Sequence, residues 1–184
     1  LSALFILAIA ISSPVQAEIP AAGTSAYIIK RDGSPIGTLK ITFERDGKRL
    51  IAKSAYSIKI KLLAIVLYRY DKYMTETYED GRLVSYETDI DDNGEKSQVR
   101  VTRDGDALNI VHPKGTLTAP LGLYPSTYWL SATPGFTQMI DSSDGVLVNV
   151  KSAEDATEDL AIDGRNIKAK RYTMSGDLVR TLWY

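Results

Sequence analysis

The sequence is first informative through what it lacks. It has no cysteine, so neither a disulfide nor a lipoprotein anchor is available to it. A catalytic triad or a zinc site needs more partners than its single histidine, His112, supplies, and we interpret His112 as a partly buried structural residue. The 22 basic and 23 acidic residues nearly cancel, which argues against a nucleic-acid partner. We predict no cofactor, no metal and no catalytic residues.

The first residues have the pattern of an export signal. An apolar stretch, Leu1 to Ile11, is too short to span a membrane, and Val15 and Ala17 fit the −3 and −1 positions of a signal-peptidase site. The stretch has no basic n-region, so we interpret residues 1–17 as an N-terminally incomplete signal peptide. A buried N-terminal helix or strand is the alternative. We expect residues 18–184 to form a single β domain with no further apolar span.

Paired turn residues are the clearest fold signal. Asp or Asn followed by Gly suits the positive φ of tight hairpin turns, and here each pair lies between runs with strand character. Seven such pairs predict an antiparallel meander. They are Asp32-Gly33, Asp46-Gly47, Asp80-Gly81, Asn93-Gly94, Asp104-Gly105, Asp144-Gly145 and Asp163-Gly164.

The runs between the turns alternate with period two, as half-buried strands do. Strands at 49–62 and 66–79 would be long and must twist, so we predict an all-β fold, a single curled antiparallel meander forming a half-barrel or barrel. Residues 113–143 hold four prolines and lack alternation, and there we predict one short helical crossing segment, at 126–130. The strand pattern that begins at Leu178 runs to Tyr184, and we expect its partner strand to be missing.

The order of several short motifs resembles a domain-of-unknown-function family of small exported proteins from Gram-negative bacteria. The resemblance covers essentially the whole mature chain, although Trp is common in the family where Tyr78 stands and His where Tyr128 stands. It implies a periplasmic location and a curled antiparallel sheet similar in shape to periplasmic lipoprotein carriers, but no activity. The motifs are Tyr27, Arg31-Asp32-Gly33, Ile36-Gly37, Tyr68-Arg69-Tyr70, Glu76, Tyr78-Glu79-Asp80-Gly81-Arg82-Leu83, Pro125-Ser126-Thr127-Tyr128-Trp129, Arg171-Tyr172, Gly176-Asp177-Leu178 and Leu182-Trp183-Tyr184.

Strand 66–79 carries the candidate ligand-binding residues. If its even positions face inward, Lys72 and Glu76 point into the concavity among tyrosines. Such charges provide either a polar contact for a ligand or a structural ion pair with a neighbouring strand. The candidate residues are Tyr70, Lys72, Glu76 and Tyr78, with Tyr128 and Trp129 as a lid.

Residues 89–94 match the first half of a calcium loop, but Arg100 stands where a bidentate Glu is required, so we favour a hairpin turn. The leading hypothesis is a non-enzymatic protein that binds a lipid or another apolar or amphipathic small molecule in the concavity. The alternative is an interaction module that docks a protein partner or a membrane surface through a sheet edge or through the basic face of Lys53, Lys59 and Lys61.

Overall fold

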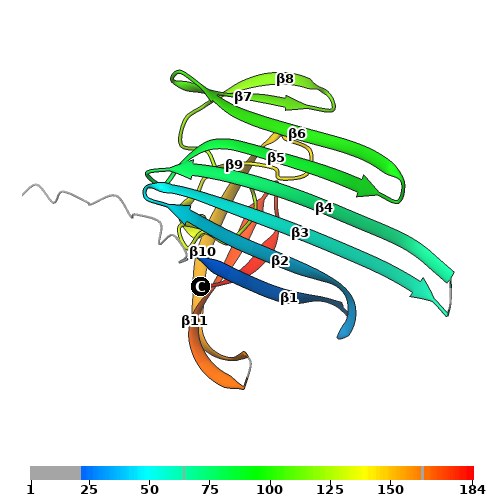
Figure 1. Cartoon of the computed structure of the whole chain (residues 1–184). Coiled ribbons are helices and arrows are strands. Elements are labelled where there is room, and N and C mark those ends of the chain that lie inside the picture. The colour runs from blue at the N-terminus through cyan, green and yellow to red at the C-terminus, as the bar shows by residue number, and fades with distance from the viewer. Residues whose placement is uncertain (1–21, 64, 163) are drawn as a thin grey trace, which may run out of the picture.

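The structure, a computed structural model, describes residues 22–63, 65–162 and 164–184, so the predicted signal peptide lies outside the described residues. Eight consecutive strands form one antiparallel meander in which each strand pairs with the next (Figure 1). They are β1 (Gly23–Arg31), β2 (Ser34–Asp46), β3 (Arg49–Leu62), β4 (Ile65–Glu79), β5 (Arg82–Asp92), β6 (Glu95–Asp104), β7 (Ala107–His112) and β8 (Gly115–Pro120).

The Asp-Gly and Asn-Gly turns account for this meander. Asp32, Asp80 and Asn93 have φ values of 50°, 49° and 55°, and the glycine after each also has positive φ. Two successive positive φ values are the geometry of a two-residue turn whose twist matches that of the flanking strands. The predicted meander is therefore confirmed for this sheet, and the predicted strand 49–62 coincides with β3.

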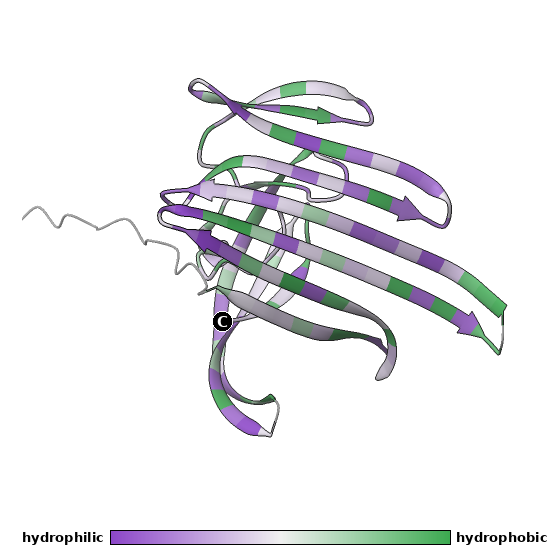
Figure 2. Cartoon of the chain, viewed as in Figure 1, coloured by the Kyte–Doolittle hydropathy of each residue, from purple (hydrophilic) through white to green (hydrophobic). Residues whose placement is uncertain are grey.

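The period-two alternation gives the large sheet two different faces. Along β3, Leu50, Ala52 and Ser54 are buried on the inner face, while Lys53 is exposed on the outer face. Figure 2 shows the same alternation of apolar and polar positions along β3 and β4. The inner face is apolar because it packs against the rest of the chain.

A second sheet corrects the prediction of a single meander. It has the order β12-β11-β10-β9, with β9 (Gln138–Ile140), β10 (Leu147–Ile162), β11 (Arg165–Gly176) and β12 (Arg180–Trp183). Among the described residues β1 and β8 do not pair, so the predicted barrel closure is wrong. The second sheet and the segment before it cover part of one face of the open first sheet. The apolar inner face is therefore buried without closure into a barrel.

The crossing segment also differs from its prediction. Strand β8 falls inside the predicted 113–143 break, so the crossing segment between β8 and β10 is residues 121–146 and includes β9. The helix expected at 126–130 is wrong: those residues form bends and irregular backbone, and the helical structure of the segment is one three-residue 3-10 turn, Thr133–Gly135. Tyr128 has φ of 60°, which a helix cannot contain.

The main core lies between the inner face of the large sheet and this crossing segment. It includes Phe43, Leu50, Tyr78 and Leu108 from the sheet, with Leu123 and Ile140 from residues 121–146. A smaller cluster, Met139, Val148, Val150 and Met174, belongs to the second sheet. Gly145 approaches the large sheet so closely that a Cβ there would lie 2.8 Å from the Cβ of His112. The crossing segment thus fills the inner face with its own side chains.

Candidate functional site

The even positions of β4 face the core. Lys72, Glu76 and Tyr78 are buried, with exposed fractions of 5%, 0% and 1%. The register places Lys72 opposite Tyr56 and Glu76 opposite Ala52 on β3, so both charges lie on the inner face of the sheet. Two charged side chains on the buried, mostly apolar face of a β-sheet need polar partners, because desolvation of an unpaired charge is costly.

Glu76 obtains its partners from its own strand and from the crossing segment. The Tyr78 hydroxyl donates to Oε2, the Trp129 Nε1–H donates to Oε1 at 3.0 Å, and the Thr127 hydroxyl donates to Oε2 at 3.4 Å. Both carboxylate oxygens are therefore occupied. The sequence suggested either a polar contact for a ligand or an ion pair with a neighbouring strand, and neither interpretation included these neutral donors. Two of the donors come from a segment about fifty residues away along the chain.

Burial has the largest effect on the pKa of the Glu76 carboxyl. It raises the pKa of Glu76 from 4.5 to about 7, while the hydrogen bonds from Tyr78, Trp129 and Thr127 and the charge of Lys72 act in the opposite direction. Burial, followed by the charge of Glu76, also raises the pKa of Tyr78 well above its usual value. The carboxyl of Glu76 is therefore a weaker acid than an exposed glutamate, because its hydrogen bonds only partly offset the effect of burial on its pKa.

Lys72 is held by a different part of the crossing segment. Its Nζ donates to Ser142 Oγ at 2.8 Å and to Ser143 Oγ at 3.0 Å, and lies 5.8 Å from the centre of the Tyr56 ring. Burial lowers the pKa of Lys72 to about 8, opposed by Asp141, Glu76 and Asp144. Positions four apart on a strand are about 13 Å apart, so Lys72 and Glu76 do not form a direct pair.

The two predicted lid residues have different positions. Trp129 lies in the main core, edge-on to Phe43 at 5.1 Å and to Tyr78 at 5.5 Å between ring centroids. Tyr128 packs against the core of the second sheet, and its backbone carbonyl accepts a hydrogen bond from the Tyr184 hydroxyl at 2.7 Å. Three predicted residues, Glu76, Tyr78 and Trp129, thus form one buried cluster, Lys72 is buried farther along the same face of β4, and Tyr128 packs against the second sheet.

The buried cluster fastens the crossing segment to the large sheet. Besides the contacts to Glu76 and Lys72, the Tyr86 hydroxyl of β5 donates to the Ser142 carbonyl. Ser142 is in turn tied to Ser126, whose hydroxyl accepts from the Ser142 backbone N–H at 3.0 Å. Polar side chains of β4 and β5 therefore position both ends of the crossing segment.

Beyond Lys72 the inner face continues toward the β3–β4 turn and is less covered. Tyr56, Ile58 and Ile60 of β3 and Tyr68 and Tyr70 of β4 are half-buried there. In Figure 1 the far halves of β3 and β4 extend past the crossing segment and the second sheet. Tyr70 belongs to this distal strip, which we define as Tyr56, Ile58, Ile60, Tyr68 and Tyr70. Lys72 lies at its inner end.

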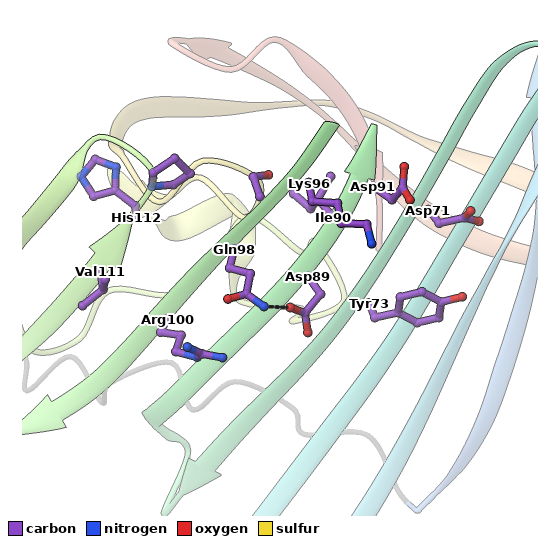
Figure 3. Close-up of a pocket in the computed structure, with 12 residues that line it drawn as sticks. Asp71, Tyr73, Asp89, Ile90, Asp91, Lys96, Gln98, Arg100, Val111 and His112 are labelled. Carbon is purple, nitrogen blue, oxygen red and sulfur yellow. Dashed lines mark hydrogen bonds between the residues drawn. The ribbon is translucent and has the colours of Figure 1, made fainter. Parts of the chain in front are cut away.

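An open cleft of about 790 Å³, not anticipated from the sequence, extends over β4–β7 to the loop after β7 (Figure 3). Its lining mixes apolar surface with charged side chains of β4, β5 and β6, among them Asp71, Asp89, Asp91, Lys96 and Arg100. The sequence signal for it was the set of charged outer-face positions, which are odd-numbered on β4 and β5 and even-numbered on β6.

The predicted calcium half-loop lies beside this cleft and forms a hairpin turn between β5 and β6. The Asp91 carboxylate accepts from the Gly94 backbone N–H at 2.8 Å, and Asp89 accepts from the Gln98 amide. Both carboxylates are thereby engaged within the hairpin. No group of three or more acidic, His or Cys side chains placed to hold a metal occurs within residues 22–63, 65–162 and 164–184.

Comparisons with known proteins identify the family of the chain but no activity. A family model described as a domain of unknown function, DUF6134, matches residues 27–184. No curated protein and no solved structure matches the chain. Within the part of the chain that the structure describes, no helix is long and apolar enough to cross a membrane.

Proposed function

The chain belongs to the DUF6134 family of unknown function, and from this premise we propose that it binds an apolar or amphipathic small molecule, such as a lipid, along the distal strip. The proposal includes a periplasmic location and a role in binding rather than in catalysis. The observation that carries it is the half-buried row of aromatic and aliphatic side chains at Tyr56, Ile58 and Tyr70, which continues an apolar inner face past its covering.

The polar end of such a ligand has a defined place. Lys72 lies at the inner end of the strip, next to Tyr56, and its ammonium is the nearest positive charge on the inner face of β4. Ligand sites combine a mostly apolar lining with a few placed polar groups. In this arrangement the acyl chain of the ligand lies on Ile58 and Ile60, and its anionic head group points toward Lys72. Glu76 is saturated by protein donors, so in this proposal it holds the crossing segment and does not contact the ligand.

The test compares two isoleucines on opposite faces of one strand. Ile58 lies on the inner face of β3, and Ile51 lies on the outer face, and both are half-buried. Binding of a fluorescent long-chain fatty acid is titrated against the native protein, Ile58→Thr and Ile51→Thr. We expect Ile58→Thr to weaken binding about fivefold, because it removes about one buried methylene-equivalent from the contact, and Ile51→Thr to leave it unchanged.

Two results would refute the proposal. One is that the native protein and both variants bind the fatty acid equally, or that none of them binds it. The other is the absence of any co-purifying lipid in native mass spectrometry of the protein isolated from its own host. The periplasmic location is checked separately, by cell fractionation of the full-length protein.

Docking through a sheet edge is the second candidate. Strand β1 is an edge of the large sheet, and Tyr27 and Ile28 on it are 53% and 65% exposed. An exposed edge with apolar side chains is a template for strand addition by a protein partner. Replacement of Ile28 by Lys would abolish such pairing but leave fatty-acid binding intact, which separates the two candidates.

A further inference from the structure

At one end of the large sheet, strands β3 and β4 extend beyond their neighbours β2 and β5. The last pair between β2 and β3 is Gly37 with Ile58, and the last pair between β4 and β5 is Tyr70 with Asp92. Residues 59–63 and 65–69, here called the overhang, therefore have no third strand beside them in the ladder. They project by about 13 Å past the sheet, given the rise per residue of a strand (Figure 1).

The tip of the overhang is apolar and exposed. Leu62, Leu63, Ile65, Val66 and Leu67 have exposed fractions of 61%, 94%, 66%, 50% and 55%. Figure 2 shows this end of β4 as a continuous apolar stretch, whereas the other turns of the large sheet contain an Asp-Gly or Asn-Gly pair or, between β7 and β8, Pro113-Lys114. Five large apolar side chains in sequence at an exposed tip exceed the scattered apolar residues of an ordinary surface and mark a contact site.

A row of basic side chains, here called the collar, lies on one face at the base of the overhang. Lys59, Lys61 and Arg69 are all exposed on the outer face, and Lys59 is directly opposite Arg69 in the ladder. Like charges directly opposite each other destabilise a sheet, and one carboxylate, Asp71, pairs with Arg69 there. The collar therefore retains a positive excess that an anionic surface would neutralise.

We propose that the overhang docks the protein on an anionic lipid bilayer, with its apolar tip in the interfacial region and the basic collar at the phosphates. An apolar tip with Lys and Arg beside its base complements the two layers of such a surface. The inference goes beyond ligand binding on the distal strip and does not depend on it.

The fold limits how deep the contact is. Beyond Arg69, the described residues of the overhang have no strand partners along their outer backbone edges, and unpaired N–H and C=O groups are too costly to place in hydrocarbon. The side chains of the tip therefore enter the interface while the backbone stays near the headgroups. The β5–β6 turn, with Asp92 and Glu95, reaches only the base of the overhang, where the Asn93 backbone N–H donates to the Arg69 carbonyl at 2.7 Å. Ile65 lies four residues, about 13 Å, beyond Arg69, which exceeds the Debye length of about 8 Å at physiological salt.

The same charges disfavour a second copy of this chain as the occupant. Tip-to-tip packing of two overhangs would bring their collars of Lys59, Lys61 and Arg69 together, and the repulsion would oppose association. An uncharged or acidic protein groove is the remaining occupant, and the experiment below distinguishes it from lipid.

The absence of cysteine makes a site-specific test simple. Leu63→Cys places a single thiol at the tip for an environment-sensitive fluorophore, and Asp104→Cys places one at an exposed turn at the opposite end of the same sheet. Each labelled protein is mixed with phosphatidylcholine vesicles with and without phosphatidylglycerol. We expect a blue shift at position 63 with the anionic vesicles, little shift with neutral ones, and none at position 104.

The collar is tested with a matched charge control. Lys59→Gln with Lys61→Gln removes two positive charges from the collar, and Lys114→Gln with Lys151→Gln removes two exposed charges elsewhere. We expect the first pair to weaken vesicle affinity about fivefold per charge and the second pair to change it less than twofold. Far-ultraviolet circular dichroism confirms that each variant is folded.

Four results would overturn the proposal. Equal shifts at positions 63 and 104 would show non-specific adsorption, and the absence of a shift at both positions would show no docking on lipid and leave a protein groove as the occupant. Equal binding to neutral vesicles would remove the role of the collar. Concentration-dependent association in sedimentation without lipid, with loss of thiol reactivity at position 63, would assign the tip to a second copy instead.

Discussion

The indole Nε1–H of Trp129 donates a hydrogen bond of 3.0 Å to Oε1 of Glu76 and so joins the crossing segment to the middle of β4. Glu76 is fully buried, and its other oxygen accepts from Tyr78 and Thr127. Glu76 is therefore one of the groups that hold residues 121–146 against the main core, which leads to the first two predictions.

Replacement of Glu76 by Gln should remove a pH dependence from folding. The pKa of Glu76 is raised from 4.5 to about 7, so between these values the folded protein keeps a proton that the unfolded chain has lost. Its contribution to stability is thus greatest below pH 4.5, falls as pH rises to about 7 and is constant above, a change of about 3 kcal/mol. Urea unfolding at several pH values should show that the native protein loses stability over this window relative to Glu76→Gln.

The control for that series is Glu79→Gln. Glu79 is the exposed last residue of the same strand, so its replacement should leave the pH profile of the native protein unchanged. Parallel profiles for the native protein and Glu76→Gln would mean that the buried carboxyl is ionised throughout or that its burial does not persist in solution.

Replacement of Trp129 by Phe should cost more than the same change at Trp183. Both indoles donate to a carboxylate at 3.0 Å, Trp129 to buried Glu76 and Trp183 to Glu158 at the surface. Removal of a donor from a buried acceptor costs about 1–3 kcal/mol, whereas an exposed acceptor regains water. Chemical denaturation of the two variants measures the difference, and equal losses would contradict a structural role for the Trp129 hydrogen bond.

Gly145→Ala should destabilise the protein more than Gly105→Ala. Both glycines have positive φ, 76° and 58°, so the backbone strain of alanine, about 1 kcal/mol, is common to both. Only at Gly145 would the new Cβ meet neighbours, the His112 Cβ at 2.8 Å and a Val99 methyl at 2.9 Å. We expect an additional loss of about 1–3 kcal/mol from this overpacking. The measurement is the shift in melting temperature, and similar shifts for both variants would indicate that the crossing segment can move away from the sheet.

Binding of an anionic amphiphile should weaken as pH rises through about 8. Burial lowers the pKa of Lys72 to about 8, so the charge at the inner end of the distal strip is lost above that value. Fluorescent fatty-acid binding should fall with pH in the native protein and should be weaker and independent of pH in Lys72→Met. Exposed Lys151, changed to Met, is the matched control, and a pH-independent native protein would exclude Lys72 as a ligand contact.

Much of the large sheet could be predicted because its signals are local. A turn such as Asn93-Gly94 sets its own backbone geometry, and the alternation along β3 fixes which side chains share a face. The extra strand β8 was missed because Pro113 and Pro120 border it and suggested a loop, although Pro120 is tolerated as the last residue of an edge strand. The helix at 126–130 was wrong because its residues make long-range bonds to Glu76 and Ile140 in place of local helical ones.

The sequence by itself determined that this is an antiparallel β protein and that Lys72 and Glu76 share a face of β4, since both follow from turn chemistry and period-two geometry. Only the tertiary structure decided that the sheet stays open, that a second sheet lies against it, and that Trp129, Thr127 and Ser142 reach these charges. The physical reason is that the partner of a buried charge is chosen by packing between distant segments, and no short stretch of sequence contains both partners.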